Sequence, residues 1–133
     1  MDRKIKYLEM IQSVINRMAN NSFLLKGWSV ILVSALFVVG AKNSNISIIL
    51  LAYFPTLAFW ILDGYFLWQE RLYRGLYNKV RNLDEADIDF SMDTRPVHSE
   101  VKRWSEVMFS KTLSIFYGTI VGAILIVMLI LIF

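Results

Sequence analysis

Two charged side chains interrupt apolar stretches of the chain, and they are the groups there most able to do chemistry. Lys26 lies near the start of an apolar run at 22–41, and Asp63 lies late in a second run at 46–68. If the runs are antiparallel membrane helices, the rise per residue places both side chains at a similar depth. We expect a Lys26–Asp63 ion pair at the inner membrane interface. The alternatives are that each side chain reaches interfacial water alone, or that Asp63 serves a proton or ion relay.

A second group of carboxylates lies at 84–93, where aspartates alternate with other residues. Counted from Asp87 as position one of a calcium loop, Asp89, Ser91 and Asp93 have suitable spacing. However, the sixth position is Met92 where such loops need glycine, and the twelfth is His98 where they need glutamate. The segment therefore predicts a solvated acidic loop.

The remaining residue types argue against catalysis. The chain has no cysteine and one histidine, which excludes thiol chemistry and multi-histidine metal sites. We find no pairing of a nucleophile with a base, no metal-ligand cluster and no phosphate-binding glycine loop. The sequence predicts a protein that is not an enzyme and that has no metal or other cofactor.

The chain has three apolar stretches, at 22–41, 46–68 and 112–133, and the first two contain Lys26 and Asp63. About 20 apolar helical residues span a bilayer, so the 133 residues predict an all-α integral membrane protein with three transmembrane helices and a single domain. Residues 42–45 are too few for more than a tight turn. Pro55 predicts a kink in the second span, because it lacks a backbone N–H.

Amphipathic helical segments are expected to extend these spans. One covers residues 1–21 and packs on its neighbours or lies on the membrane surface; a second continues the span at 46–68; a third runs from Pro96 through Lys111 into the last span. The acidic loop separates the second and third within the extension at 69–111. Their apolar stripes are Ile5, Leu8, Ile11, Ile15 and Met18; Leu72, Leu76, Val80 and Leu83; and Val97, Val101, Trp104 and Met108.

The basic residues predict the orientation. Of fourteen Lys and Arg residues, all but Lys42 lie in residues 1–26 or 69–111. The positive-inside rule then places the N-terminus and the amphipathic helices in the cytoplasm and the C-terminus outside. Trp28, Trp68 and Trp104 are expected to form an aromatic belt on the cytoplasmic side.

Four basic residues follow the second span: Arg71, Arg74, Lys79 and Arg81. Beside a membrane, anionic lipid head groups are the expected partner of this surface, with an unidentified cytoplasmic protein as the alternative. Nucleic acid is not expected.

Two lines of small residues suggest close helix packing in lipid. Gly27, Ser34 and Ala41 recur every seven residues in the first span, and Ser114, Gly118 and Gly122 recur every four in the last. Small residues let membrane helices approach closely. Because three helices cannot enclose a pore alone, we expect a cyclic homo-oligomer held through these faces. A polar pathway along the first line is the alternative.

Longer strings carry a resemblance to known proteins. RMANNSFLLKGWSV at 17–30, LDGYFLWQERLYRGLY at 62–77, FSKT at 109–112 and FYG at 116–118 are similar to those of small uncharacterised bacterial inner-membrane proteins. The layout also resembles that of RipA-like octameric membrane proteins and, more distantly, of SLATT-type domains, which are proposed pore-forming effectors. This chain differs from SLATT domains in having an additional C-terminal span.

Two functions follow as expectations. One is a homo-oligomeric pore or channel-like protein of the bacterial inner membrane, linked to stress or phage defence as the resemblance implies. The other is a non-conducting scaffold whose cytoplasmic helices bind a protein.

Overall fold

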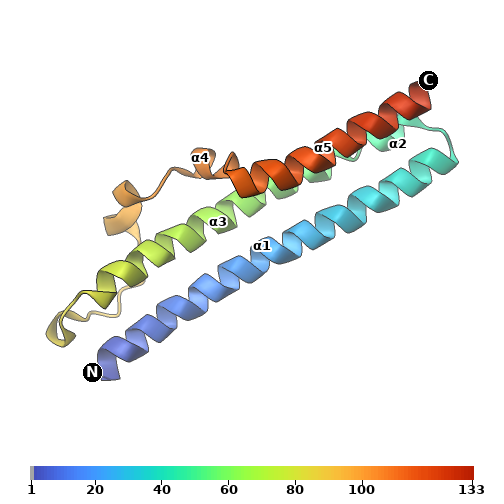
Figure 1. The fold of residues 1–133 in the computed structure, drawn as a ribbon. Helices are drawn as coiled ribbons and strands as arrows, with labels where there is room; N and C mark the ends of the chain where they lie inside the picture. Colours follow the sequence, from blue (N-terminus) through green and yellow to red (C-terminus); the bar gives the residue numbers. More distant parts are fainter. Residues whose placement is uncertain (1) are drawn as a thin grey trace.

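The computed structural model describes residues 2–133, which fold into helices joined by short connections (Figure 1). The helices in chain order are α1 (Asp2–Lys42), α2 (Ile46–Leu50), α3 (Tyr53–Arg81), η1 (Glu85–Asp87), η2 (Arg95–Glu100), α4 (Trp104–Met108) and α5 (Lys111–Ile132). Three of the segments, Asp2–Lys42, Ile46–Arg81 and Lys111–Ile132, contain stretches long and apolar enough to cross a membrane. The prediction of an all-helical chain with three such helices is confirmed.

Helix α1 is one unbroken helix of 41 residues. At 1.5 Å per residue it is about 60 Å long, roughly twice the thickness of a bilayer core. The expected amphipathic segment at 1–21 and the first span are therefore parts of the same helix. The predicted stripe is wrong at its first position, because Ile5 is 48% exposed and Tyr7 is buried instead.

The turn between α1 and α2 is a Schellman motif. The amide of Asn45 donates to the carbonyl of Gly40 (2.9 Å), and that of Ser44 donates to the carbonyl of Ala41 (3.3 Å). Ser44 has φ 50°, in the left-handed region. The side chain of Asn45 then accepts from the amide of Ser47 and caps α2. The chain reverses within a few residues, as a tight antiparallel hairpin requires.

The expected kink in the second span is a break at Leu51–Ala52, between α2 and α3. Pro55 lies in the first turn of α3. It has no N–H to donate to the carbonyl of Leu51, four residues earlier. That carbonyl accepts from Phe54 instead (3.2 Å), and Thr56 bonds Ala52 through both its amide and its hydroxyl. Proline is tolerated in the first turn of a helix for this reason.

The prediction of a continuous helix from Pro96 into the last span is wrong. The structure has the 3-10 helix η2, the single-turn helix α4 and a further break at Phe109–Ser110 before α5 begins. Val97 and Val107 are buried, so the apolar residues of this segment do pack on α3, but as short separate turns.

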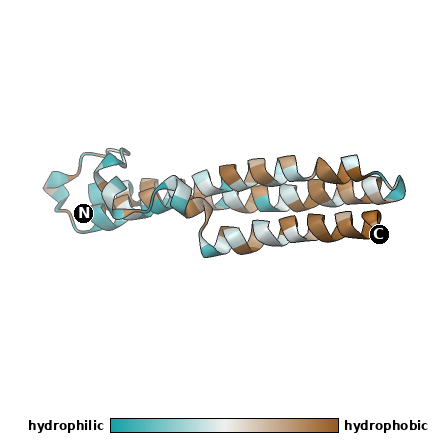
Figure 2. Cartoon of the chain, turned by 90° about the horizontal axis from the view of Figure 1, so that it is seen from above, coloured by the Kyte–Doolittle hydropathy of each residue, from teal (hydrophilic) through white to brown (hydrophobic). Residues whose placement is uncertain are grey.

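Two hydrophobic cores lie at opposite ends of the α1–α3 pair. We call residues 22–68 and 111–133 the apolar half, and residues 2–21 and 69–110 the polar half; Figure 2 shows the difference in hydropathy along the molecule. The core of the apolar half is Val33, Ile49, Ala52, Leu113, Tyr117, Ile120 and Ile124. The core of the polar half is Tyr7, Ile11, Ile15, Leu76, Val80 and Ile88.

Candidate functional site

The carboxylate of Asp63 is the centre of a polar cluster that joins α1, α3 and α5. Asp63 is fully buried. The ammonium of Lys26 lies 2.6 Å from its Oδ2, and the hydroxyl of Tyr117 donates to the same oxygen at 2.9 Å. The hydroxyl of Ser22 donates to Oδ1. The sequence prediction paired Lys26 with Asp63, and the structure adds Ser22 and Tyr117 as partners that sequence spacing did not suggest.

Lys26 links this cluster to the surface. Its ammonium also donates to Ser22 Oγ (2.9 Å) and lies 5.9 Å from the centroid of the Phe116 ring. Its side chain is 21% exposed, whereas that of Asp63 is not exposed at all. The buried carboxylate is therefore compensated by one cation and two hydroxyl donors. A buried charge that is paired and hydrogen-bonded in this way fixes the relative position of the helices that contribute to it.

Aromatic packing holds Tyr117 in place. The indole of Trp60 stacks on the Tyr117 ring, with centroids 5.7 Å apart and an interplanar angle of 11°. The Trp60 Nε1–H donates to the carbonyl of Met108 at 2.6 Å, so the same side chain ties α4 to α3. Trp60 thus positions the start of α5 in two ways: directly through the Tyr117 ring, and through Met108 of α4, which leads into α5.

Gly64, the residue after Asp63, provides the space for α4. A Cβ at this position would overlap the Met108 side chain and lie 3.2 Å from the Met108 Cα. Glycine therefore allows the backbone of α4 to lie directly on α3. Because α4 leads into α5, this contact also determines where Tyr117 meets Asp63.

A second aromatic cluster lies where the two halves meet. Trp68 stacks on Trp104 with centroids 6.3 Å apart, and Tyr65 meets Trp104 edge-on. The Trp104 Nε1–H donates to the carbonyl of Ile61 (3.4 Å). Trp28, the third residue of the predicted belt, is 59% exposed on α1. Tryptophan is typical of membrane–water interfaces, and Trp68 and Trp104 lie where the two halves meet.

The predicted small-residue lines lie mostly on the outer surface of the helix bundle. Gly27, Ser34, Ala41 and Gly118 are exposed, Ser114 and Gly122 are half-buried, and a Cβ at Gly27, Gly118 or Gly122 would meet no atom within 4 Å. Within the chain, α1 instead meets its neighbours through a different line that includes Ser22, Ser29, Val33 and Gly40. The exposed residues of the predicted lines are thus not used in packing between the helices of this chain.

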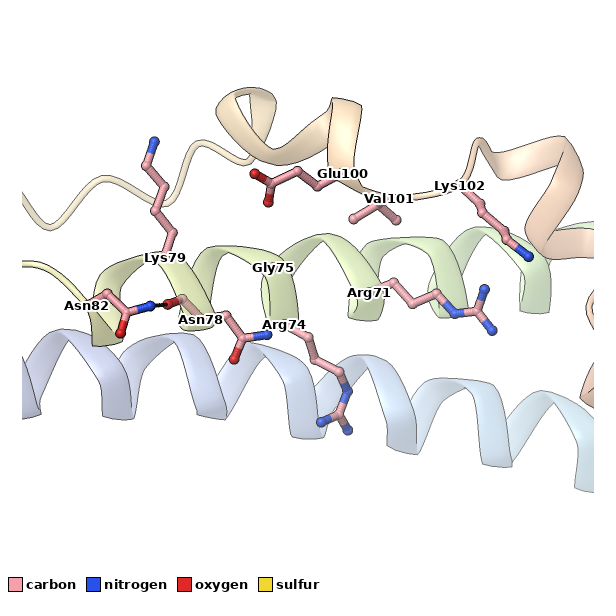
Figure 3. Close-up of a pocket in the computed structure, with 9 residues that line it drawn as sticks. All are labelled: Arg71, Arg74, Gly75, Asn78, Lys79, Asn82, Glu100, Val101 and Lys102. Carbon is pink, nitrogen blue, oxygen red and sulfur yellow. Dashed lines mark hydrogen bonds between the residues drawn. The ribbon is translucent and has the colours of Figure 1, made fainter.

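The predicted basic surface on α3 divides into two parts. Arg71, Arg74 and Lys79 line a groove between α3 and residues 100–102, with a volume of about 620 Å³, whereas Arg81 is not among its lining residues (Figure 3). Lys102 and Glu100 complete the charged lining from the opposite side. Sequence reasoning missed Lys102 because it lies 23 to 31 residues away from Arg71, Arg74 and Lys79 along the chain.

The acidic loop is anchored to the start of α1. The Glu85 carboxylate accepts from the backbone amides of Arg3 (2.9 Å) and Lys4 (3.2 Å), as favoured at a helix N-terminus. Tyr7 donates to the carbonyl of Ser91 and meets Phe90 edge-on. Among residues 2–133, no three His, Asp or Glu side chains are placed to hold a metal ion. The loop is anchored to α1, while Asp84, Asp87 and Asp89 are exposed, as expected for a solvated acidic loop.

No protein-family model, curated protein sequence or solved structure shows significant similarity to the chain. The resemblances described from the sequence stay predictions, and the functional argument depends on the geometry of this chain.

Proposed function

We propose that the protein is a homo-oligomer of the bacterial inner membrane, with the polar half in the cytoplasm, and that it is a non-conducting scaffold that presents this half to a protein partner. One observation carries the proposal: the charged side chains inside the apolar half, Lys26 and Asp63, neutralise one another within the protomer. The other charged residues of this half, Lys42 and Lys111, lie at helix ends. The outward faces therefore offer small and apolar side chains for packing but no charge to attract an ion.

The outward-facing small residues support assembly. Gly27 and Ser34 on α1 and Gly118 on α5 are exposed, and small residues are what close helix contacts in lipid need. The groove between α1 and α5 contains Ser34, Thr119 and Ala123 among mostly apolar neighbours. A helix of a second copy could pack closely there, and cyclic symmetry would repeat this contact between successive copies.

The hydroxyl groups in this groove also give a reason to retain a pore as the second candidate. Ser34 and Thr119 would be the polar lining if several copies placed this groove around an axis. The Thr119 hydroxyl donates to the carbonyl of Ile115 (2.6 Å), so its oxygen can still coordinate a cation, but its proton is not available to an anion.

Two measurements test these proposals. Because the chain has no cysteine, single cysteines at Ser34 and Gly118 can be cross-linked without background, and we expect covalent dimers in native membranes. Gly118→Leu should reduce the oligomer on native gels, whereas the matched control Ile130→Leu, at a residue 68% exposed, should not. A monomer at all protein concentrations would contradict assembly.

Ion flux from proteoliposomes distinguishes scaffold from pore. We expect no flux above that of empty liposomes. Flux that Ser34→Leu abolishes, with Val38→Leu as control, would contradict the scaffold and support the pore.

A further inference from the structure

The groove between α3 and residues 100–102 has an excess of positive charge that the protein does not neutralise. Its charged lining consists of four cations, Arg71, Arg74, Lys79 and Lys102, and one carboxylate, Glu100. Arg74 pairs with Glu70 at 3.0 Å. Within residues 2–133, neither Arg71, Lys79 nor Lys102 lies within ion-pair distance of a carboxylate. The groove therefore has unused capacity to bind an anion.

The cations are not spread evenly along the groove. Arg71 and Lys102 extend toward the same end, the end nearer the apolar half, from opposite walls (Figure 3). Lys79 and Glu100 lie toward the other end, together with the amides of Asn78 and Asn82. An anion is thus expected at the Arg71–Lys102 end, because the carboxylate at the other end repels it.

The end with Arg71 and Lys102 lies beside the aromatic boundary between the two halves. Arg71 follows Trp68 by three residues, or about 4.5 Å along the helix, and Lys102 precedes Trp104 by two. Trp68 and Trp104 stack on one another at this boundary. Since tryptophan side chains lie at the level of the lipid head groups, Arg71 and Lys102 lie at the depth of the lipid phosphates.

We propose that the groove binds the phosphate of an anionic membrane lipid between Arg71 and Lys102. The Arg71 guanidinium offers a fork of donors to the phosphate oxygens, and the Lys102 ammonium adds a charge from the other wall. The polar head group extends toward Asn78 and Asn82. A lipid at this position joins α3 to the connection that leads into α4. The proposal is independent of the oligomeric state and of whether the protein conducts.

Titration of the purified full-length protein in non-ionic detergent, followed by native mass spectrometry, tests this proposal. Phosphatidylglycerol should bind in preference to phosphatidylcholine. Arg71→Gln and Lys102→Gln should each weaken phosphatidylglycerol binding about tenfold, which corresponds to the loss of one charged hydrogen-bonding partner. Glu100→Gln should strengthen binding, because it removes the repelling carboxylate.

The matched control is Arg81→Gln, which makes the same charge change on the same helix but outside the groove. We expect it to leave binding unchanged; an effect equal to that of Arg71→Gln would show non-specific attraction and overturn the proposal. Weaker binding by Glu100→Gln would also overturn it. A pyrophosphate titration without lipid identifies the source of the phosphate: tight pyrophosphate binding with no preference among lipids would exclude a lipid as the ligand. Helical content measured by circular dichroism confirms that each variant is folded.

Discussion

The two halves of the molecule use polar and apolar residues in opposite ways. The apolar half buries four polar residues, Ser22, Ser29, Thr56 and Asp63, and exposes large hydrophobic residues such as Ile31, Phe54 and Ile130. The polar half buries Tyr7, Ile11, Leu76 and Val80, and most of its charged side chains are exposed. The same two helices, α1 and α3, run through both halves, so the difference comes from side chains and not from backbone architecture.

This inversion shows that the two ends of α1 and α3 are suited to different solvents. In lipid, polar groups need partners inside the protein, and Ser22, Ser29, Thr56 and Asp63 all make hydrogen bonds. In water, apolar burial stabilises the fold, and the hydrophobic core of the polar half provides it. Two ion pairs reflect the same contrast: Asp63–Lys26 is buried, and Asp93–Arg95 is on the surface.

The largest effect is expected at Asp63. Asp63→Ala removes the anion and leaves Lys26 partly buried without its counter-ion, which should lower the free energy of unfolding by about 3–5 kcal/mol. Denaturant unfolding in detergent micelles would measure this. The double variant Lys26→Met, Asp63→Leu should recover most of the loss, because no charge is left unpaired. A double variant as unstable as Asp63→Ala would show that the charge itself does not matter.

The second-largest loss of stability is expected for Ile11→Ala, and it should be confined to the polar half. Ile11→Ala leaves a cavity at a fully buried position and should cost about 3 kcal/mol. Hydrogen exchange should accelerate at the start of α1 and the end of α3 and stay slow in the apolar half. Ile5→Ala, at an exposed position in the same helix, is the matched control and should have little effect. Faster exchange throughout the apolar half would mean that the halves do not fold separately.

Gly64→Ala tests the contact that joins the halves. The new Cβ would overlap Met108, so α4 must move away from α3, at a cost of about 1–3 kcal/mol. Proteolysis within residues 95–110 should become faster. Gly118→Ala, where the Cβ meets no atom, should not change proteolysis or stability in the monomer. Equal protease sensitivity of Gly64→Ala and wild type would contradict the close contact between α4 and α3.

The smallest effect is expected for the surface ion pair between Asp93 and Arg95. Hydrogen bonds from the Arg95 side chain, and then from its backbone amide, lower the pKa of Asp93 from 3.8 to about 2. The stabilisation is therefore present above pH 3.8 and is lost as the pH falls through about 2. NMR titration of the carboxyl carbon should show this pKa returning toward 3.8 in Arg95→Gln and unchanged in Arg103→Gln. An ordinary pKa in the wild type would show that the pair does not persist in solution.

The elements that depend on composition could be predicted from the sequence, and those that depend on distant contacts could not. Apolar runs identified the three candidate spans, and helical rise paired Lys26 with Asp63. Tyr117 was not predicted as a partner, because its position opposite Asp63 depends on the break at Phe109–Ser110 and on Gly64. Ser110, the N-cap residue of α5, is of a type common at helix starts, but the apolar spacing from Val97 to Met108 is also compatible with a continuous helix.

The polar half illustrates a second limit. Tyr7 combines an apolar ring with a polar hydroxyl group, so hydrophobic periodicity does not favour its burial over that of Ile5. Its burial depends on Phe90 and the carbonyl of Ser91, which are more than 80 residues away. The capping of α1 by Glu85 is equally distant along the chain. Such contacts follow from how the loop returns to α1, which a single sequence does not specify.

Cysteine accessibility tests the two-solvent account most directly. Single cysteines at Ser13, Ile31, Asn43, Asn82 and Ile126 would be exposed to a membrane-impermeant maleimide in right-side-out and inverted vesicles. We expect labelling of positions 13 and 82 from the cytoplasmic side only, of position 43 from the opposite side only, and of positions 31 and 126 from neither. Labelling of positions 13 and 43 from the same side, or ready labelling of position 31 or 126, would contradict the account.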